Sequence, residues 1–330
     1  DVILISGPPG SGKTVMAFHR AEALATKFDS VNLMMFNKVL RKFSNNATSD
    51  KKIKVKTMHS WFFRWWMDVT HTKPPQIEDW VYDWKRMFNI LLEKQTSGDL
   101  DIDKLHWGHI VIDEAQDFSN KRYEFLNQVR LAFFSGRELP SATILADENQ
   151  MLTDNNSTLN EIKDTFKIDK ASNLFNLTKN YRNTDQINSF IEYFYVGLET
   201  GKTRPAGKKG NKPELVFCDN FAKTVKYIAR YARAYQNHEI GVIVPTNYER
   251  RQYYGALDEI LIDSKFNVQS YANKSKLHTA ESLEFDKEGT ISILNRASCK
   301  GLEFDAVFIP ELSRMKIDDS DLDKFKMNMY

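Results

Sequence analysis

The sequence is poor in cysteine and has no long apolar run. Its two cysteines, Cys218 and Cys299, lie far apart, which excludes the disulfide framework of small secreted domains and predicts a reducing compartment. No apolar run approaches the roughly 20 residues that span a bilayer, and the chain opens on a buried-strand pattern instead of a signal peptide. We therefore expect a cytoplasmic protein without a membrane partner.

The sequence also lacks a strong charge of either sign. It has 46 Lys and Arg against 44 Asp and Glu, a net charge of +2. Because no overall basic excess is present, any binding of nucleic acid has to come from a local groove. The length of 330 residues is too great for one typical core and predicts two domains.

Short apolar runs alternate with helical patterns over the first half of the chain. The expected strands are residues 2–6, 31–36, 53–56, 109–112 and 142–146. Helical patterns cover 14–27, 38–43 and the aromatic stretch 61–92. This alternation predicts a parallel α/β sheet with ligands at the carboxyl ends of its strands.

A second α/β series follows. Its expected strands are residues 214–218, 240–244, 290–294 and 306–309, with helices at 222–235 and 248–262 and a basic surface loop at 201–213. We predict two tandem α/β domains with parallel sheets, 1–172 and 173–330. The first carries a small helical insertion at about 61–105, and the second has no large accessory insertion.

The segment GPPGSGKT at residues 7–14 fits the P-loop pattern and lies between an expected strand and an expected helix. Backbone N–H groups of such a loop surround phosphates, and the helix N-terminus adds its positive end. The expected nucleotide-binding residues of the loop are Gly7, Gly10, Ser11, Gly12, Lys13 and Thr14. Lys13, which we expect to be exposed in the empty loop, reaches the β- and γ-phosphates, and the Thr14 hydroxyl binds Mg²⁺. The plainer alternative is a Gly/Pro turn.

The segment VIDEAQD at residues 111–117 supplies the acids that such a site requires. Asp113, at the end of a buried strand, would hold Mg²⁺. Glu114 would orient or deprotonate the attacking water. The alternative is a pair of exposed acids that cap the next helix.

Further motifs make the chain resemble superfamily 1 helicases of the UvrD/Rep-like branch. Beside DEAQD at 113–117, these motifs are FNK at 36–38, TMHSW at 57–61, ADENQ at 146–150, LTKNYR at 177–182 and KGLEFD at 300–305. The resemblance implies an ATP- and Mg²⁺-dependent motor that moves along single-stranded DNA, with RNA possible, from 3′ to 5′. It also implies that both domains are RecA-like P-loop domains and that the nucleotide lies between them.

The resemblance also implies roles for single residues. Gln150 would couple the γ-phosphate to the strand-binding surface, and Arg182 would be an arginine finger from the second domain. Tyr181 would stack on adenine, and Glu303 would hold the ribose. The expected contacts to the strand backbone are Phe36, Asn37, Lys38, Thr57 and His59.

Each of these residues has a structural alternative. Tyr181 fits a packed core aromatic, Arg182 a surface ion pair, and His59 a core or capping histidine. The aromatic run at residues 61–66 (WFFRWW) suggests a base-stacking platform, but its helical spacing favours packing.

The chain departs from the family pattern at several places. Ala146 replaces the usual glycine, no aromatic follows at 151–156, and Asn295 and Ala297 replace Thr and His. The adenine-reading glutamine motif and the last arginine motif are expected outside the printed sequence, before Asp1 and after Tyr330. The chain therefore resembles a compact member of the branch.

Three functions compete. The first is a translocase that unwinds duplexes. The second is a nucleotide-gated switch, or an ATPase subunit of a defence or repair complex that binds nucleic acid or a nuclease partner without processive unwinding. The third, a small-molecule kinase, shares only the P-loop and leaves Arg182 and Gln150 unexplained.

Overall fold

The computed structural model describes residues 1–36, 38–46, 50–78, 81–151, 156–273, 275–314 and 322–329, without the side chains of 43–46 and 328. The chain divides into two compact units. The first contains residues 1–36, 48–211 and 326–330, and the second contains 37–47 and 212–325. None of the described helices is long and apolar enough to cross a membrane.

The first unit is built on a parallel sheet. Its strands have the order β3-β2-β6-β7-β1-β8, and they pair in parallel throughout. The bounds are β1 Val2–Ser6, β2 Val31–Met35, β3 Ile53–Thr57, β6 His109–Ile112, β7 Ser141–Ala146 and β8 Leu174–Asn176. The apolar residues of β1, β2, β3, β6 and β7 are mostly buried, as expected for a parallel sheet covered on both faces, whereas Phe175 of the edge strand β8 is 50% exposed.

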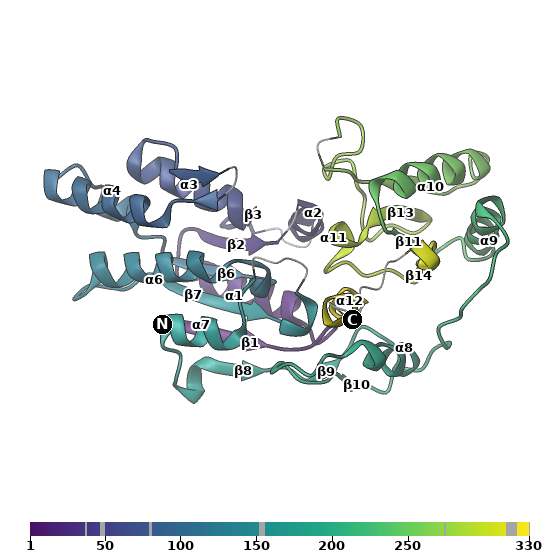
Figure 1. Cartoon of the computed structure of the whole chain (residues 1–330), viewed down its shortest axis with the longest axis horizontal. Coiled ribbons are helices and arrows are strands. Elements are labelled where there is room, and N and C mark those ends of the chain that lie inside the picture. Colours follow the sequence, from purple (N-terminus) through teal and green to yellow (C-terminus); the bar gives the residue numbers. More distant parts are fainter. Residues whose placement is uncertain are drawn as a thin grey trace. The chain divides into compact units, whose positions relative to one another are not determined.

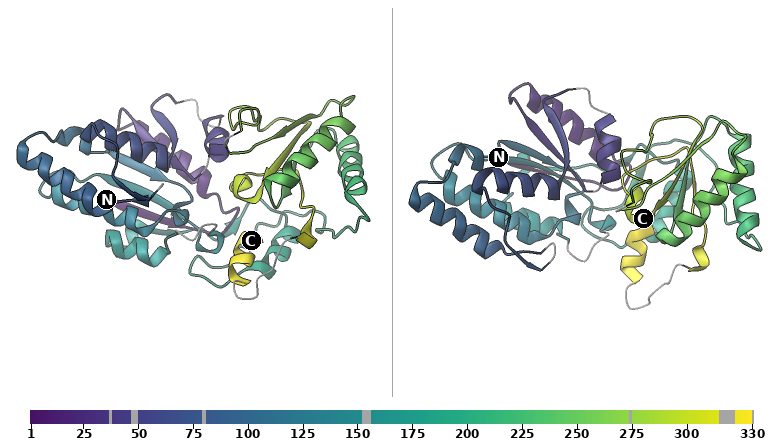
Figure 2. Two further views of the ribbon diagram at one scale, coloured as in Figure 1. Left: turned by 45° about the horizontal axis from the view of Figure 1, so that its top comes forward. Right: turned by 90° about the horizontal axis from the view of Figure 1, so that it is seen from above.

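Helices cover both faces of this sheet (Figures 1 and 2). They are α1 Lys13–Ala25, α3 Met58–Thr70, α4 Trp84–Ser97, α5 Ile102–Leu105, α6 Asn120–Phe134 and α7 Leu159–Phe166. Short elements complete the unit: β4 Gln76–Glu78, β5 Val81–Tyr82, β9 Lys179–Asn180, α8 Asp185–Ile191, β10 Arg204–Pro205 and the 3₁₀ turns η1 Ala115–Asp117, η2 Glu148–Gln150, η3 Ala171–Asn173 and η4 Glu192–Phe194.

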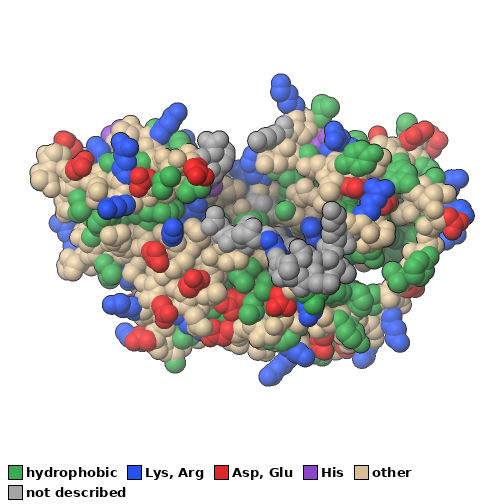
Figure 3. Space-filling view, viewed as in Figure 1, with side chains coloured by type: hydrophobic (Ala, Val, Ile, Leu, Met, Phe, Trp, Pro, Cys, Tyr) green, Lys and Arg blue, Asp and Glu red, His purple; other side chains and the backbone are tan. Residues whose placement is uncertain are grey.

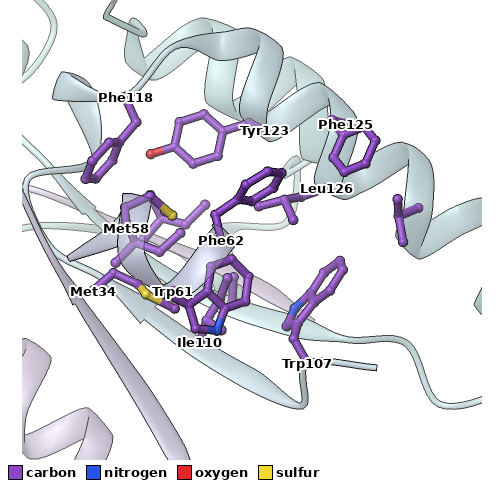
Figure 4. Packing of buried hydrophobic residues seen from close by; sticks show 14 of the residues in the cluster. Met34, Met58, Trp61, Phe62, Trp107, Ile110, Phe118, Tyr123, Phe125 and Leu126 are labelled. Carbon is purple, nitrogen blue, oxygen red and sulfur yellow. The ribbon is translucent and has the colours of Figure 1, made fainter. Parts of the chain in front are cut away.

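The aromatic run at residues 61–66 belongs to the core of the first unit. Trp61, Phe62, Trp65 and Trp66 are at most 6% exposed, and the rings of Trp61 and Trp65 stack at 5.8 Å. Figure 4 shows Trp61 and Phe62 of α3 among side chains of β6 and α6. The packing interpretation of these four residues is therefore confirmed, because buried rings present no face to a base.

The second unit contains a smaller parallel sheet of order β12-β13-β11-β14. Its elements are α2 Lys38–Asn46, α9 Phe221–Ala234, β11 Glu239–Val244, α10 Asn247–Ile260, β12 Asn267–Ser270, β13 Thr290–Asn295, α11 Arg296–Cys299, β14 Ala306–Phe308 and η5 Leu312–Arg314. Helices α9 and α10 pack with β11 and β13 in one core cluster. The last helix, α12 Leu322–Met329, contains the division at residue 325. The predicted α/β class with parallel sheets is confirmed.

The compact units differ from the predicted division at 172/173. Strand β8 pairs with β1, so residues beyond 173 belong to the first sheet. In the other direction, Val39 of α2 packs with Ile243 and Leu294 of the second unit. The reason is that strand pairing and apolar packing, which decide unit membership, join segments that are distant in sequence.

Two local predictions were wrong. Residues 214–218 form no strand, and Leu215 and Phe217 are 69% and 88% exposed, because no sheet edge pairs with the segment. The helical pattern at 61–92 is interrupted by the β4–β5 hairpin. Pro74 and Pro75 account for the interruption, since proline breaks a helix and disfavours helical geometry in the residue before it.

Candidate nucleotide site

The P-loop connects β1 to α1 in the first unit. Gly10 and Gly12 have φ of 69° and 90°, in the left-handed region that favours glycine. Helix α1 begins at Lys13 without a side-chain cap, so its first N–H groups are available to an anion. The full motif in a strand–loop–helix context therefore favours a phosphate-binding loop over an ordinary Gly/Pro turn.

Lys13 is bound within this loop. Its Nζ donates hydrogen bonds to the carbonyl oxygens of Gly7 at 2.6 Å and Pro8 at 3.1 Å, and lies 3.8 Å from Asp147 Oδ2. The side chain is only 7% exposed, so the prediction of an exposed lysine was wrong. The loop's own carbonyls and Asp147 hold the ammonium group at the place that a phosphate would share.

Asp113 lies at the carboxyl end of β6, beside the P-loop. Its Oδ2 accepts a hydrogen bond from Thr14 Oγ1 at 2.8 Å, and its Oδ1 accepts one from the Glu114 N–H at 3.0 Å. Burial, and next the charge of Glu114, raise the pKa of Asp113, while Thr14 and Lys13 oppose the rise. Asp113 and Glu114 are both buried, which excludes the alternative of exposed capping acids.

Gln116 connects Glu114 to β7. Its Nε2 donates to Glu114 Oε2 at 2.7 Å, and its Oε1 accepts from the Asp147 N–H at 2.9 Å. Glu114 has φ 53°, in the left-handed region. Gln116 and Asp147 received no role from sequence reasoning, although both stand inside recognised motifs. Their contacts fix the orientation of the Glu114 carboxylate and the position of Lys13.

The donor set fits a magnesium ion that is shared with a nucleotide. Thr14 and Asp113 offer a hydroxyl and a carboxylate 2.8 Å apart, and burial disfavours a lone negative charge on Asp113. Among the described residues no group of three or more His, Cys, Asp or Glu could hold a metal by itself. Mg²⁺ usually takes one or two carboxylates with substrate phosphates and waters, which agrees with this set.

The segment after β9 contacts the P-loop directly. The Tyr181 N–H donates to Gly10 O at 2.8 Å. Asn180 Oδ1 accepts from the N–H groups of Arg182 and Asn183, each at 3.0 Å. Tyr181 is 64% exposed, so it is not a core aromatic. Arg182 lies in the first unit with the P-loop, which differs from its expected place in a second domain.

The η2 turn after β7 carries Gln150. Asp147 Oδ1 accepts from the Asn149 N–H at 3.1 Å, and the Glu148 carboxylate accepts from the Leu159 N–H. Gln150 is half-buried. This turn therefore places Gln150 at the end of β7, three residues after the aspartate that contacts Lys13.

The expected strand contacts are divided between the units. Phe36 follows β2, Thr57 ends β3 and His59 is in the first turn of α3, all in the first unit. Thr57 Oγ1 caps α3 by accepting from the Ser60 N–H at 3.3 Å. Lys38 begins α2 in the second unit, where Glu303 is exposed before β14. Asn37 is outside the described residues.

His59 has a partner on the β4–β5 hairpin. Its Nδ1 lies 3.3 Å from the Tyr82 hydroxyl, and the two rings stack at 5.8 Å. Burial, and next the charge of Arg122, lower the pKa of His59. His59 is therefore half-buried in surroundings that favour its neutral form, beside an arginine that sequence reasoning did not single out.

Comparison with solved structures finds distant likenesses. The T. fusca Cas3 structure is 11% identical with a TM-score of 0.44, and the alignment covers 93% of this chain and 40% of that one. The Pif1 helicase from Candida albicans is 13% identical with a TM-score of 0.43, and its alignment covers 81% of this chain and 52% of that one. The NS3-like helicase from Alongshan virus is 14% identical with a TM-score of 0.37, and its alignment covers 93% of this chain and 60% of that one. The chain thus spans only about half the length of these proteins, and no curated protein sequence matches it.

A family model decides the assignment. The model for the Schlafen group 3 DNA/RNA helicase domain matches residues 1–310, nearly the whole chain. It confirms the coarser expectation of a helicase family, while the UvrD/Rep-like branch stays a prediction. The P-loop, the buried Asp113–Glu114 pair and this match lead to one conclusion: the chain belongs to the Schlafen group 3 DNA/RNA helicase domain family.

Proposed function

We propose that this chain is the ATP-hydrolysing motor of a single-strand translocase or helicase that acts on DNA more than on RNA and moves from 3′ to 5′. One observation carries the proposal: within a single unit, hydrogen bonds hold Lys13, Asp113, Glu114 and the segment with Arg182 around one P-loop. A phosphate-binding loop alone would suit many functions, but this set also provides for the attacking water and the developing charge.

Different residues of the chain bind the phosphates, hold the metal ion and activate the attacking water. The N–H groups of residues 7–14 and Lys13 bind the phosphates, and Lys13 exchanges its contacts with Gly7 O and Pro8 O for them. Thr14 and Asp113 would hold Mg²⁺, which when bound neutralises phosphate charge. Glu114, oriented by Gln116, accepts the proton of the attacking water.

Arg182 and Gln150 complete the proposed chemistry. Arg182, whose backbone is fixed by Asn180 against Gly10, stabilises charge on the transferred phosphoryl group. Gln150, at the end of β7, senses the γ-phosphate. Tyr181, with its exposed ring, and Glu303 contact the adenine and the ribose.

One observation favours the second candidate, a nucleotide-gated switch without processive unwinding. Asn295, which stands where the related family has a strand-contacting threonine, caps α11 by accepting from the Ser298 N–H at 3.0 Å. Its Nδ2 also donates to Asn247 Oδ1 at 3.3 Å. Both polar atoms of the Asn295 side chain thus make hydrogen bonds within the protein, which weakens the case for one expected contact with the strand.

Steady-state ATP hydrolysis with and without single-stranded DNA or RNA tests the proposal. Arg182→Ala should keep nucleotide affinity, because the P-loop supplies most ground-state contacts, and should lose about 10³–10⁵ in turnover if Arg182 acts as an arginine finger. Arg182→Lys should not rescue turnover, since a point charge lacks the planar fork.

Directional strand displacement separates the two candidates. Strand-stimulated hydrolysis with displacement supports the helicase, and stimulation without displacement supports the switch. Normal hydrolysis by Arg182→Ala would remove Arg182 from the active site and contradict the proposed mechanism.

A further inference from the structure

Arg122, in the first turn of α6, is a cation enclosed by aromatic rings. Its guanidinium carbon lies 5.9 Å from the ring centroid of Phe62 and 5.7 Å from that of Phe118. Both rings are buried, and both are labelled in Figure 4. The aromatic faces orient the guanidinium and replace part of its hydration.

The described residues give Arg122 no anion. Across the described ranges its side chain makes no hydrogen bond or ion pair, and its Nε is buried without a partner. The titratable groups that face it are Tyr82, Tyr123 and His59. Burial raises the pKa of both tyrosines and lowers that of His59, so none of the three supplies a negative charge. Arg122 is partly buried, and a partly desolvated cation without a counter-charge is costly. Its persistence here indicates a site that an external anion completes.

The position of Arg122 indicates which anion this is. The ring centroids of Phe118 and Phe36 lie 6.1 Å apart. The ring of Tyr82, which faces Arg122, stacks on that of His59. Phe36, His59 and Phe118 lie in the segments that follow the carboxyl ends of β2, β3 and β6, where a parallel sheet binds its ligands. The P-loop follows β1, which β7 separates from β6 in the sheet order. Arg122 therefore adjoins the proposed strand contacts Phe36 and His59.

We propose that Arg122 receives one phosphodiester group of the bound single strand. This inference rests on the proposed function, because it names the strand as the occupant. A guanidinium offers parallel N–H donors that match two phosphate oxygens, and every nucleotide carries the same phosphate, so the contact is indifferent to sequence. The rings of Phe62 and Phe118 hold the guanidinium in position before the strand binds.

The test measures the affinity of the full chain for labelled oligo-dT and oligo-rU over a range of salt concentrations. Arg122→Gln should weaken binding and reduce the slope of log K against log salt by about 0.7, the value for one single-strand phosphate contact. Lys121→Gln is the matched control, because it removes an equal charge from the adjacent exposed residue. Its slope should stay near that of the wild type.

The outcomes are distinguishable. A wild type without salt-dependent strand binding contradicts the proposed function itself. If the wild type binds the strand and Arg122→Gln has the same salt slope as the wild type, only the role proposed for Arg122 is overturned. A purely structural arginine would lower the Tm without changing the slope. If Arg122→Gln reduces the salt slope with only one of the two oligonucleotides, the inference is supported for that nucleic acid.

Arg122→Lys serves if Arg122→Gln does not fold. It keeps the charge, so the salt slope should remain, but affinity should fall several-fold because lysine lacks the planar fork. Wild-type affinity in Arg122→Lys would overturn the proposal.

Discussion

At the residue scale, Glu114 has an unusual combination of properties. It is 5% exposed, has a left-handed backbone with φ 53°, and accepts a hydrogen bond from Gln116. A non-glycine residue in this conformation is strained, and such strain tends to occur at functional sites. The Gln116 contact fixes which way the carboxylate faces.

Glu114→Gln should bind ATP and hydrolyse it slowly. The loss in turnover should be about 10²–10⁴-fold, the usual contribution of a general base. Nucleotide and metal binding should survive, because Asp113 remains and its pKa is no longer raised by the Glu114 charge. Single-turnover hydrolysis and nucleotide titration measure the two effects. A variant that cannot bind nucleotide would instead assign Glu114 to the metal site.

At the element scale, the P-loop and the segment after β9 are in close contact. A Cβ on Gly10 would lie 2.2 Å from Asn180 Oδ1, which already accepts two backbone N–H groups. A Cβ on Gly12 meets nothing within 4 Å, although its φ is also positive. The two glycines thus separate the effect of steric contact from that of backbone strain.

Gly10→Ala should lower the Tm more than Gly12→Ala does. Both variants strain the backbone, but only the first displaces Asn180 from its contacts with Arg182 and Asn183. Thermal unfolding of both variants measures the difference. Equal shifts would mean that the loop and the β9 segment are not packed together in solution.

Strands β6 and β7 enclose a histidine. His109 lies 2.9 Å through Nε2 from Thr143 Oγ1 and 2.8 Å through Nδ1 from Ser141 Oγ. Burial, and next the charge of Arg20, lower its pKa to about 3. An unfolded histidine protonates below about 6.5, so the stability that His109 contributes is present above that pH and is lost as pH falls towards 3.

His109→Gln should remove this part of the pH dependence. Each proton of difference between the states changes the free energy of unfolding by up to about 1.36 kcal/mol per pH unit. Denaturant unfolding between pH 7 and 5 should therefore show a shallower decline for the variant than for the wild type. Parallel curves would show that His109 is protonated in the folded protein or does not contribute.

At the scale of the whole molecule, the chain crosses between its two compact units more than once. Charges of both signs are interspersed over the face that Figure 3 shows, in agreement with a net charge of +2. In the unit that carries the P-loop, the long segment that begins at residue 48 extends to residue 211. Strand β8, beyond the predicted boundary, pairs with β1 and so supports the strand that leads into the loop.

A fragment that ends at residue 172 should be less stable than one that ends at residue 211. The shorter fragment leaves the β1 edge unpaired and removes the Asn180–Gly10 contact, and exposed strand edges favour aggregation. Both fragments lack the residues of the second unit against which α2 packs, so this loss lowers the stability of both and does not affect the comparison. Soluble yield and unfolding midpoint compare the two, and equal values would support the boundary at 172.

The sequence by itself determined the parallel α/β class, the P-loop and the acids at the end of β6. These features depend on local pattern: apolar runs of strand length, and glycines and a lysine at fixed spacing. Periodicity also favoured packing for Trp61 and Trp65, which are buried. The helicase family followed from the order of short motifs and agrees with the family model.

Only the tertiary structure decided which distant segments meet. It joined β8 to β1, packed α2 in the second unit and turned Lys13 onto the loop's own carbonyls. It also enclosed Arg122 between Phe62 and Phe118 without an anion. The physical reason is that strand pairing, burial and the compensation of charge depend on neighbours in space, which the spacing of residues along the chain does not specify.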